Sequence, residues 1–279
     1  MSSSERHEQL LPFPRLPEAV KQRYSISELT LRPFGIYEND LNLDFINSPR
    51  PFLVTDILDS CTTDVFGNRV DRNLFWDLTV GARTECLLRL ISAGDQFEIE
   101  LSLKCPNRDC GHELELGLNP DEISELQQQA QIQDYLSLVV KGQQLKLRRP
   151  TGNDQLLWLK SSFESEDAAL QQMFRTLTLA GAETLAADSL DEVGRVMEEH
   201  DPLVRFSVQV RCPDCEHEGA CEVDLEELSL NRLRQAQFRL LAAVHRLAAH
   251  YHWSEEEIFK VPYWRRDYYL GLLDREKQR

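Results

Sequence analysis

Two short segments that each carry a pair of cysteines constrain this chain more than any other feature of its sequence. Cys105 and Cys110 lie between two runs of alternating apolar residues, and so do Cys212 and Cys215. Such alternation places the apolar side chains on one face of a β-strand, so each pair predicts a β-hairpin with a cysteine knuckle at its turn. Both turns begin with Cys-Pro and continue into His-Glu, and the two hairpins therefore form an internal repeat.

The four cysteines of these turns predict one shared structural zinc site. Four thiolates in a tetrahedron, with sulfur about 2.3 Å from the metal, complete the coordination of a structural Zn²⁺ and leave no open position. Cys212 and Cys215 have standard knuckle spacing, and the four residues between Cys105 and Cys110 still fall within the range found in zinc sites. The ion would act as a long-range staple, because about a hundred residues separate the two turns.

Other arrangements of the same residues remain open from the sequence. The cysteines can be reduced thiols without a metal, since small buried thiols are common in proteins. His112 or His217 can replace a thiolate or support the ligands from outside. A self-contained second-hairpin site would consist of Cys212, Cys215, His217 and Cys221. Strand alternation turns Cys221 inward, however, which favours an ordinary core position for it.

Charge and cysteine content limit the compartment and the class of partner. The formal net charge is −16, which repels nucleic-acid backbones and anionic membrane surfaces. Seven cysteines without an apolar signal segment predict a reducing, cytoplasmic location, where paired thiols hold metal more often than they form disulfides. Cys61 and Cys86 lie on helical patterns and are expected in the core. The apolar runs are far shorter than the roughly 20 residues of a membrane helix, so no membrane insertion is expected.

The motifs of zinc enzymes are missing from the sequence. His112-Glu113 is not followed by the second histidine of a metalloprotease helix. Pro106 and Pro213 follow a cysteine, whereas the deaminase signature places proline before it. We therefore expect a non-enzymatic protein.

The predicted fold class is α+β, with the two hairpins forming a zinc-ribbon-like core. An extended, proline-containing arm is expected over residues 1–27, a helical region over 28–94 and a second helical region over 227–279. The region 95–226 holds the hairpins, at 95–119 and 203–226, on either side of an α/β insertion at 120–202.

Local patterns predict the individual elements. Helices are expected around 52–58 and 75–90 with a stop at Gly94, then after Pro120, from Asp154, from Glu166, over 230–251 and after Pro262. One strand is expected over 135–147. Thr151 with Asp154, and Ser254 with Glu257, have the spacing of N-terminal helix caps.

Three stretches of this sequence have a particular character. They are Glu28-Leu-Thr-Leu-Arg-Pro33, the first knuckle hairpin with Leu147-Arg-Arg-Pro-Thr-Gly-Asn-Asp154, and Val244-His-Arg-Leu-Ala-Ala-His-Tyr-His-Trp-Ser-Glu255 continuing to Arg265-Arg266. In these stretches the chain resembles the hub-type baseplate proteins of contractile phage tails and of extracellular contractile injection systems. The resemblance runs from about Glu28 to Leu273, and its most particular part is the His-Trp-Ser-Glu segment with the following proline, arginines and aromatics. It implies a non-catalytic role in building a baseplate, near the central hub and spike.

The same resemblance gives the expected partners. Aromatic residues and arginines after residue 250 have the composition of an interface hot spot. They are Trp253, Tyr263, Trp264, Arg265, Arg266, Tyr268 and Tyr269. Burial in the final helices is the other expectation for each of them. The partners would be hub, spike, tube or tape-measure proteins, met in the cytoplasm during assembly.

A zinc-ribbon adaptor for nucleic acid is the alternative function. Paired knuckles occur in such adaptors, and Lys104, Arg108 and Arg211 border the knuckles of this chain. The overall negative charge opposes this alternative.

Overall fold

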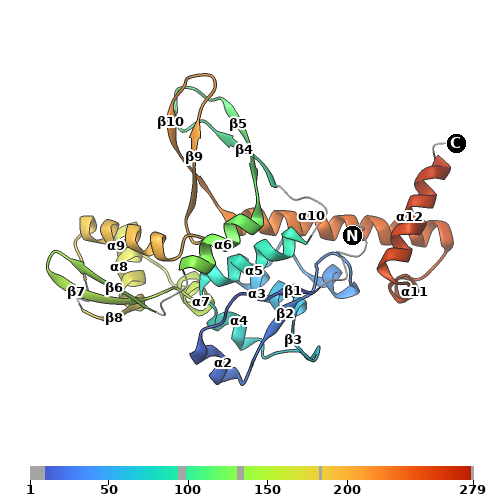
Figure 1. Ribbon diagram of the computed structural model, residues 1–279, viewed down its shortest axis with the longest axis horizontal. Coiled ribbons are helices and arrows are strands. Elements are labelled where there is room, and N and C mark those ends of the chain that lie inside the picture. The colour runs from blue at the N-terminus through green and yellow to red at the C-terminus, as the bar shows by residue number, and fades with distance from the viewer. Residues whose placement is uncertain (1–9, 94–98, 131–134, 182–183, 278–279) are drawn as a thin grey trace.

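The long helix α10 (Leu225–Tyr251) connects the parts of the molecule, from the base of two β-hairpins to the carboxy-terminal helices (Figure 1). The protein is described by a computed structural model over residues 10–93, 99–130, 135–181 and 184–277. Asp224 caps α10, because its side chain accepts a hydrogen bond from the backbone N–H of Glu227. The helix ends where His252 adopts a left-handed conformation, at φ 57°.

The main apolar core lies in a body below the hairpins. It packs a small sheet against helices α3, α4, α5 and the first turns of α10. The elements of the body are β1 (Leu11–Pro12), α2 (Glu18–Tyr24), β2 (Leu29–Leu31), η1 (Glu38–Asn42), α3 (Arg50–Cys61), β3 (Thr62–Asp64), α4 (Asn73–Asp77) and α5 (Val80–Ser92). Cys61 and Cys86 are fully buried in this core, which confirms the prediction for both.

The first described residues differ from the extended arm expected over 1–27. Strand β1 pairs antiparallel with β2, with Leu11 opposite Leu31, and α2 follows directly after Pro17. Leu16 is buried in the body core, so this segment has an apolar anchor that a purely extended arm lacks. Residues 1–9 of the predicted arm lie outside the described residues.

The helical pattern predicted over 75–90 is divided between α4 and α5. The break occurs because the Thr79 side chain accepts a hydrogen bond from the backbone N–H of Ala82 and so begins a new helix. The predicted stop at Gly94 and the first strand position, Phe97, lie outside the described residues.

The sheet and the last two helices of the insertion form a lobe of their own beside the body. Strands β6, β7 and β8 make an antiparallel sheet that packs on α8 and α9 around a separate apolar cluster. The elements of this region are α6 (Pro120–Ala130), β6 (Tyr135–Val140), β7 (Gln143–Arg148), α7 (Gly152–Lys160), α8 (Glu166–Leu177), β8 (Thr178–Ala180) and α9 (Ala187–His200). The single strand predicted over 135–147 is thus wrong, because Lys141 and Gly142 form a turn with φ values of 48° and 81°.

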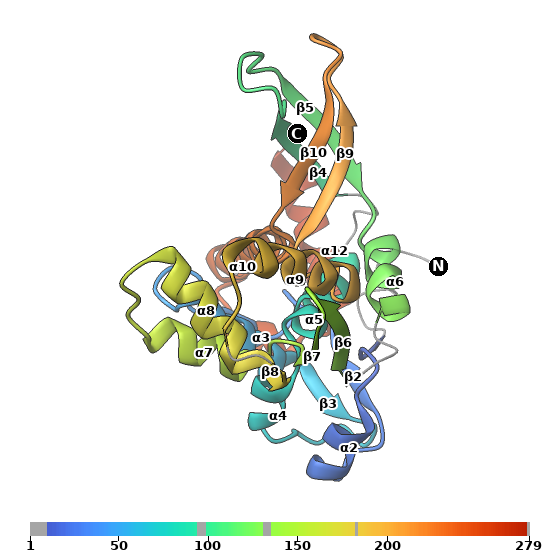
Figure 2. The ribbon, with the colours of Figure 1, turned by 90° about the vertical axis from the view of Figure 1, so that its left-hand side faces the viewer.

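The two predicted knuckle hairpins are present and stand out from the body as an arm (Figures 1 and 2). Strands β4 (Ile99–Lys104) and β5 (Glu113–Leu118) make the first, and β9 (Phe206–Arg211) and β10 (Glu218–Val223) make the second. Their apolar faces meet each other, and the base of the arm packs on α5 and α6. The mixed α+β class is confirmed, but the hairpins form a projection and the main core lies below them.

The helices after α10 pack back onto its second half. Helix α11 (Glu255–Lys260) begins with the predicted cap, in which Ser254 and Glu257 exchange hydrogen bonds. Helix α12 (Tyr263–Lys277) follows, and Ile258 lies with Val244 and Leu247 in a small apolar cluster between these helices.

Candidate metal centre

The two knuckles close in the same way, which extends the sequence repeat to the backbone. The N–H of Cys105 donates to the carbonyl of His112 at 2.8 Å, and the N–H of Cys212 donates to the carbonyl of His217 at 2.9 Å. In each turn the residue after the second cysteine has a positive φ, 67° for Gly111 and 55° for Glu216. This left-handed residue turns the chain back into its second strand.

The four predicted ligands lie together at the end of the arm. Their sulfur atoms all lie within 4.8 Å of one another. Cys105 Sγ is 3.7 Å from Cys215 Sγ, and Cys110 Sγ is 3.8 Å from Cys212 Sγ. Four sulfurs at about 2.3 Å from a central ion would be about 3.8 Å apart. Both short contacts join one hairpin to the other, so the group exists only while the hairpins are side by side.

Backbone N–H groups surround these sulfurs. The N–H groups of Cys215 and Asp214 point at Cys212 and lower the pKa of its thiol to about 7. The N–H of Asn107 points at Cys105, and that of His112 points at Cys110. N–H groups directed at sulfur stabilise thiolates, which are the form that binds metal.

The thiols also shift one another's pKa values, and those of Cys105 and Cys110 lower the pKa of Cys212. Burial raises the pKa of Cys105, and the thiols of Cys212 and Cys215 raise it further, whereas the N–H of Asn107 and the thiol of Cys110 lower it. The N–H of His112 lowers the pKa of Cys110, but burial and the other three thiols outweigh it and raise the value to about 12. Four thiolates this close repel one another unless a cation lies between them, so the donor set fits a thiophilic metal ion.

Close packing between the hairpins holds the group in place. A Cβ atom on Gly219 of the second hairpin would lie 3.0 Å from Cγ of Pro106 in the first, closer than an ordinary contact, so a larger residue would push Pro106 back by a few tenths of an ångström. Cys212 is fully buried, Cys105 is 6% exposed, Cys110 is half-buried and Cys215 is exposed. The site is therefore at the surface, closed on the side of the arm and open at its tip.

The other residues considered from the sequence lie outside the group. Cys221 is buried below it in an apolar cluster, and its Sγ donates to the carbonyl of Lys104 at 3.5 Å. His112 and His217 are exposed, and neither belongs to the metal-ligand group found among the described residues. The predicted self-contained site in the second hairpin thus has less geometric support than the shared one.

The seven predicted partner-binding residues divide between the interior and the surface. Trp253 stacks on Tyr251 at 4.8 Å between ring centroids and also contacts Tyr269, so these two predicted residues pack within the chain. Arg266 is buried and donates to the carbonyl of Ile36 at 2.7 Å. Tyr263 is half-buried. The exposed members of the set are Trp264, Arg265 and Tyr268.

Two arginine–aspartate pairs were missed from the sequence. Arg32 binds Asp40 through both oxygens at 3.1 and 2.6 Å, and Arg148 binds Asp154 in the same way at 2.6 and 2.7 Å. Each arginine follows a leucine at the end of a strand, and each aspartate caps the helix that comes next. The repeated Leu-Arg and the following Pro at positions 31–33 and 147–150 were the available signal.

Comparison with known proteins found no relative. The chain matches no protein-family model, no curated protein sequence and no solved structure. Across the described ranges, no helix combines the length and the apolar character required to cross a bilayer.

Proposed function

We propose that Cys105, Cys110, Cys212 and Cys215 hold one structural zinc ion that fixes the two hairpins to each other. The observation that carries this proposal is the pair of sulfur contacts between the hairpins, at 3.7 and 3.8 Å. These match the edge of a zinc–thiolate tetrahedron. The apparent binding free energy of such an ion is on the order of 10 kcal/mol, similar to the whole net stability of a domain.

X-ray absorption at the zinc edge, together with the metal content of the purified protein, tests this assignment. We expect about one zinc per chain, with four sulfur neighbours at about 2.3 Å. Nitrogen or oxygen neighbours in the spectrum would show that one of the nearby histidines or Asp214 binds the ion in place of a thiolate. Protein purified without added metal that contains none, and takes up none, would refute the site.

We further propose that the protein is a non-enzymatic structural or assembly component of the baseplate hub of a contractile tail or contractile injection system. The support is the likeness of the three sequence stretches given above. A projecting arm, held by a site without an open coordination position, suits a part that binds other proteins. Exposed Trp264 and Tyr268 on α12 suit contact with hub, spike, tube or tape-measure proteins.

Particles assembled with and without this chain test the second proposal. We expect the chain to be present in purified tails or in hub intermediates, and its deletion to stop assembly before a complete baseplate forms. Deletion that leaves normal, functional tails would refute the proposal. Presence in intermediates but not in finished tails would identify an assembly factor that leaves the particle.

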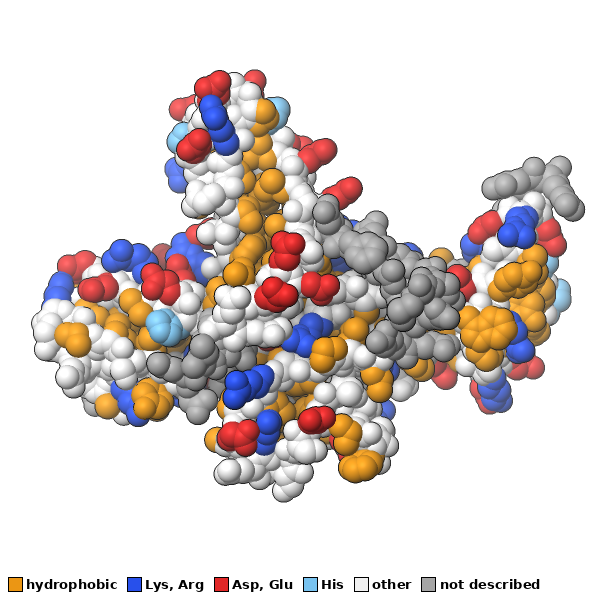
Figure 3. All heavy atoms as spheres, viewed as in Figure 1, with side chains coloured by type: hydrophobic (Ala, Val, Ile, Leu, Met, Phe, Trp, Pro, Cys, Tyr) orange, Lys and Arg blue, Asp and Glu red, His pale blue; other side chains and the backbone are white. Residues whose placement is uncertain are grey.

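The surface of the knuckles gives the nucleic-acid alternative little support. Arg211 lies 3.4 Å from Glu216 and 3.9 Å from Glu218, so the two carboxylates offset its charge. Acidic side chains and histidines lie beside the basic ones at the tip of the arm (Figure 3). A salt titration of binding to duplex and single-stranded DNA separates the two functions, because phosphate contacts lose affinity steeply with salt.

A further inference from the structure

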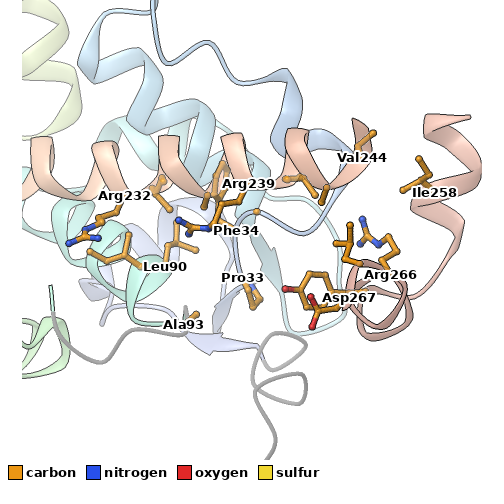
Figure 4. Close-up of a pocket in the computed structure, with 18 of the residues that line it drawn as sticks. Pro33, Phe34, Leu90, Ala93, Arg232, Arg239, Val244, Ile258, Arg266 and Asp267 are labelled. Atoms are coloured by element: carbon orange, nitrogen blue, oxygen red, sulfur yellow. The ribbon is translucent and has the colours of Figure 1, made fainter. Parts of the chain in front are cut away.

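A groove runs along α10 on the side that faces the end of α5 and the carboxy-terminal helices (Figure 4). Its volume is about 480 Å³, within the range of ligand-binding cavities. Leu233, Leu240, Val244 and Leu270 give it an apolar floor. Pro33 and Phe34 form part of its wall, in the loop after β2. Leu233, Leu240 and Val244 are 2, 5 and 8% exposed, so the apolar floor lies deep in the groove.

The groove is long rather than round. Its lining residues on α10 extend from Arg232 to Leu247, which corresponds to about 22 Å at the rise of an α-helix. An elongated apolar groove beside a helix is the usual receptor for an amphipathic peptide segment.

Arginines line this groove in a protein with a net charge of −16. Arg232, Arg239 and Arg266 all contribute to its surface, against one carboxylate, Asp267 (Figure 4). The local charge is therefore opposite in sign to that of the whole chain, and it would attract acidic groups.

Arg266 is the least exposed of these arginines, with 7% of its surface exposed. Its Nη2 donates to the carbonyl of Ile36, and its guanidinium lies over the rings of Phe259 and Tyr263. Its Nε has no hydrogen-bond partner among the described residues. Among the described residues, neither Arg266 nor the exposed Arg239 forms an ion pair. A buried guanidinium without a carboxylate partner is unusual.

We propose that this groove binds an acidic, amphipathic segment of a partner protein, which places apolar side chains on the α10 floor and carboxylates on Arg239 and Arg266. Arg239 on α10 and Arg266 on α12 line the same groove and can bind two carboxylates spaced along one segment, whereas Arg232 donates to the carbonyl of Glu100. A fatty acid of similar apolar length carries a single carboxylate and would engage only one end of this row of arginines. This inference rests on the proposed role as an assembly protein and specifies the chemistry of its partner.

Peptide selection on the full-length, zinc-loaded chain tests the inference. The probe is a displayed library of random peptides of about 15 residues, the length that spans the groove as a helix. We expect selected peptides to combine leucines and acidic residues at helical spacing. Arg239→Glu is expected to weaken their binding by about tenfold or more, measured by fluorescence anisotropy. Ala243→Trp, which places a large side chain in the groove, should also weaken it.

Arg234→Glu provides the matched control, because it makes the same charge change on the same helix outside the groove lining. Its binding should stay within about twofold of the unaltered chain. Failure to select acidic amphipathic peptides, or equal effects of the Arg239 and Arg234 substitutions, would overturn the inference. So would oleate that displaces every selected peptide and itself depends on Arg239, since it would identify a lipid site. None of these outcomes bears on tail incorporation, which tests the proposed function separately.

Discussion

Cys105 Sγ lies 3.7 Å from Cys215 Sγ, although 110 positions separate the two residues along the chain. The contact has a counterpart between Cys110 and Cys212 at 3.8 Å, and together the two contacts join the hairpins at their tips. Below the tips the arm is held by the meeting of two narrow, two-stranded sheets. Sheets of this size are marginal on their own, so an ion in the cysteine group would stabilise the arm at its tip.

Substitution of one ligand should remove the ion. We expect Cys212→Ser to lose most of its zinc and about 5 kcal/mol or more of stability against urea, because three thiolates and a hydroxyl make a much weaker site. Metal content and urea unfolding are the measurements. Cys221→Ser is the control, since Cys221 lies on the same hairpin outside the cysteine group and should keep a full equivalent of zinc. Full zinc in the Cys212→Ser protein would contradict the four-thiolate assignment.

The left-handed position of the second knuckle should favour glycine over the glutamate that occupies it. Glu216 has φ 55°, where Gly111 occupies the matching position of the first knuckle with φ 67°. We expect Glu216→Gly to stabilise the protein by about 0.5 to 1 kcal/mol, because glycine adopts this conformation without the clash of a Cβ atom. Thermal unfolding with zinc bound is the measurement. Glu218→Gly, in strand β10 of the same hairpin, should instead destabilise.

The pair of Arg148 and Asp154 should make stability depend on acid pH. Burial raises the pKa of Asp154, but hydrogen bonds from Arg148 and Thr151 outweigh it and hold the pKa below the usual 3.8. A lowered carboxyl pKa stabilises the folded state at neutral pH, and that contribution is lost as the pH falls below about 4. We expect Asp154→Asn to cost about 3 kcal/mol at pH 7, and to flatten the loss of stability below pH 4.

Urea unfolding at a series of pH values measures both effects. Asp188→Asn is the control, because the ion pair of Asp188 with Lys141 is at the surface, with 78% of the Asp188 side chain exposed. Its effect should be small. Equal losses of stability in the two variants would show that the buried pair contributes no more than a surface contact.

Asp201 should show the opposite dependence on pH. Its Oδ1 accepts a hydrogen bond from Gln127, its Oδ2 has no partner among the described residues, and burial raises its pKa above 3.8. The folded state then holds this proton more tightly than the unfolded state, so stability falls as the pH rises from about 4 through the raised pKa. We expect Asp201→Asn to remove that slope and to stabilise the protein at pH 7 by about 1 kcal/mol.

The amide that Asp201→Asn introduces keeps an oxygen for Gln127, so the hydrogen bond is conserved. Glu125→Gln, on the exposed side of the same α6 helix as Gln127, should change neither the stability nor its slope with pH. A loss of stability at every pH in Asp201→Asn would show that the ionised form is required.

The features that the sequence predicted correctly are those written in short, local patterns. The two hairpins follow from alternation around the cysteines, and the helix caps at Thr151 and Ser254 follow from the residue three positions later. The four cysteines could be chosen as candidate ligands before the structure because zinc ligands come in closely spaced pairs. That the pairs meet was a prediction from the repeat, and the structure brings them together.

Features that depend on distant partners were not predicted. Arg83 lies on α5 and is fully buried, because its guanidinium donates to the carbonyls of Phe75 and Pro51 at 2.6 and 2.7 Å. Nothing in its local sequence distinguishes it from a solvated arginine. Leu241 fits the apolar spacing of α10 but is 42% exposed, since no described element covers that side of the helix. Periodicity identifies a candidate face, and tertiary packing decides how much of it is buried.

The placement of the two knuckles on either side of the insertion imposes an order on biosynthesis. A ribosome adds roughly 5 to 20 residues per second, so the first pair of thiols exists for about 5 to 20 seconds before the second pair is made. During that interval the nascent chain can offer an ion only half of its ligands. A four-thiolate site can therefore form only after the ribosome has passed Cys215, and metal loading would mark the point at which the whole insertion has emerged and folded back.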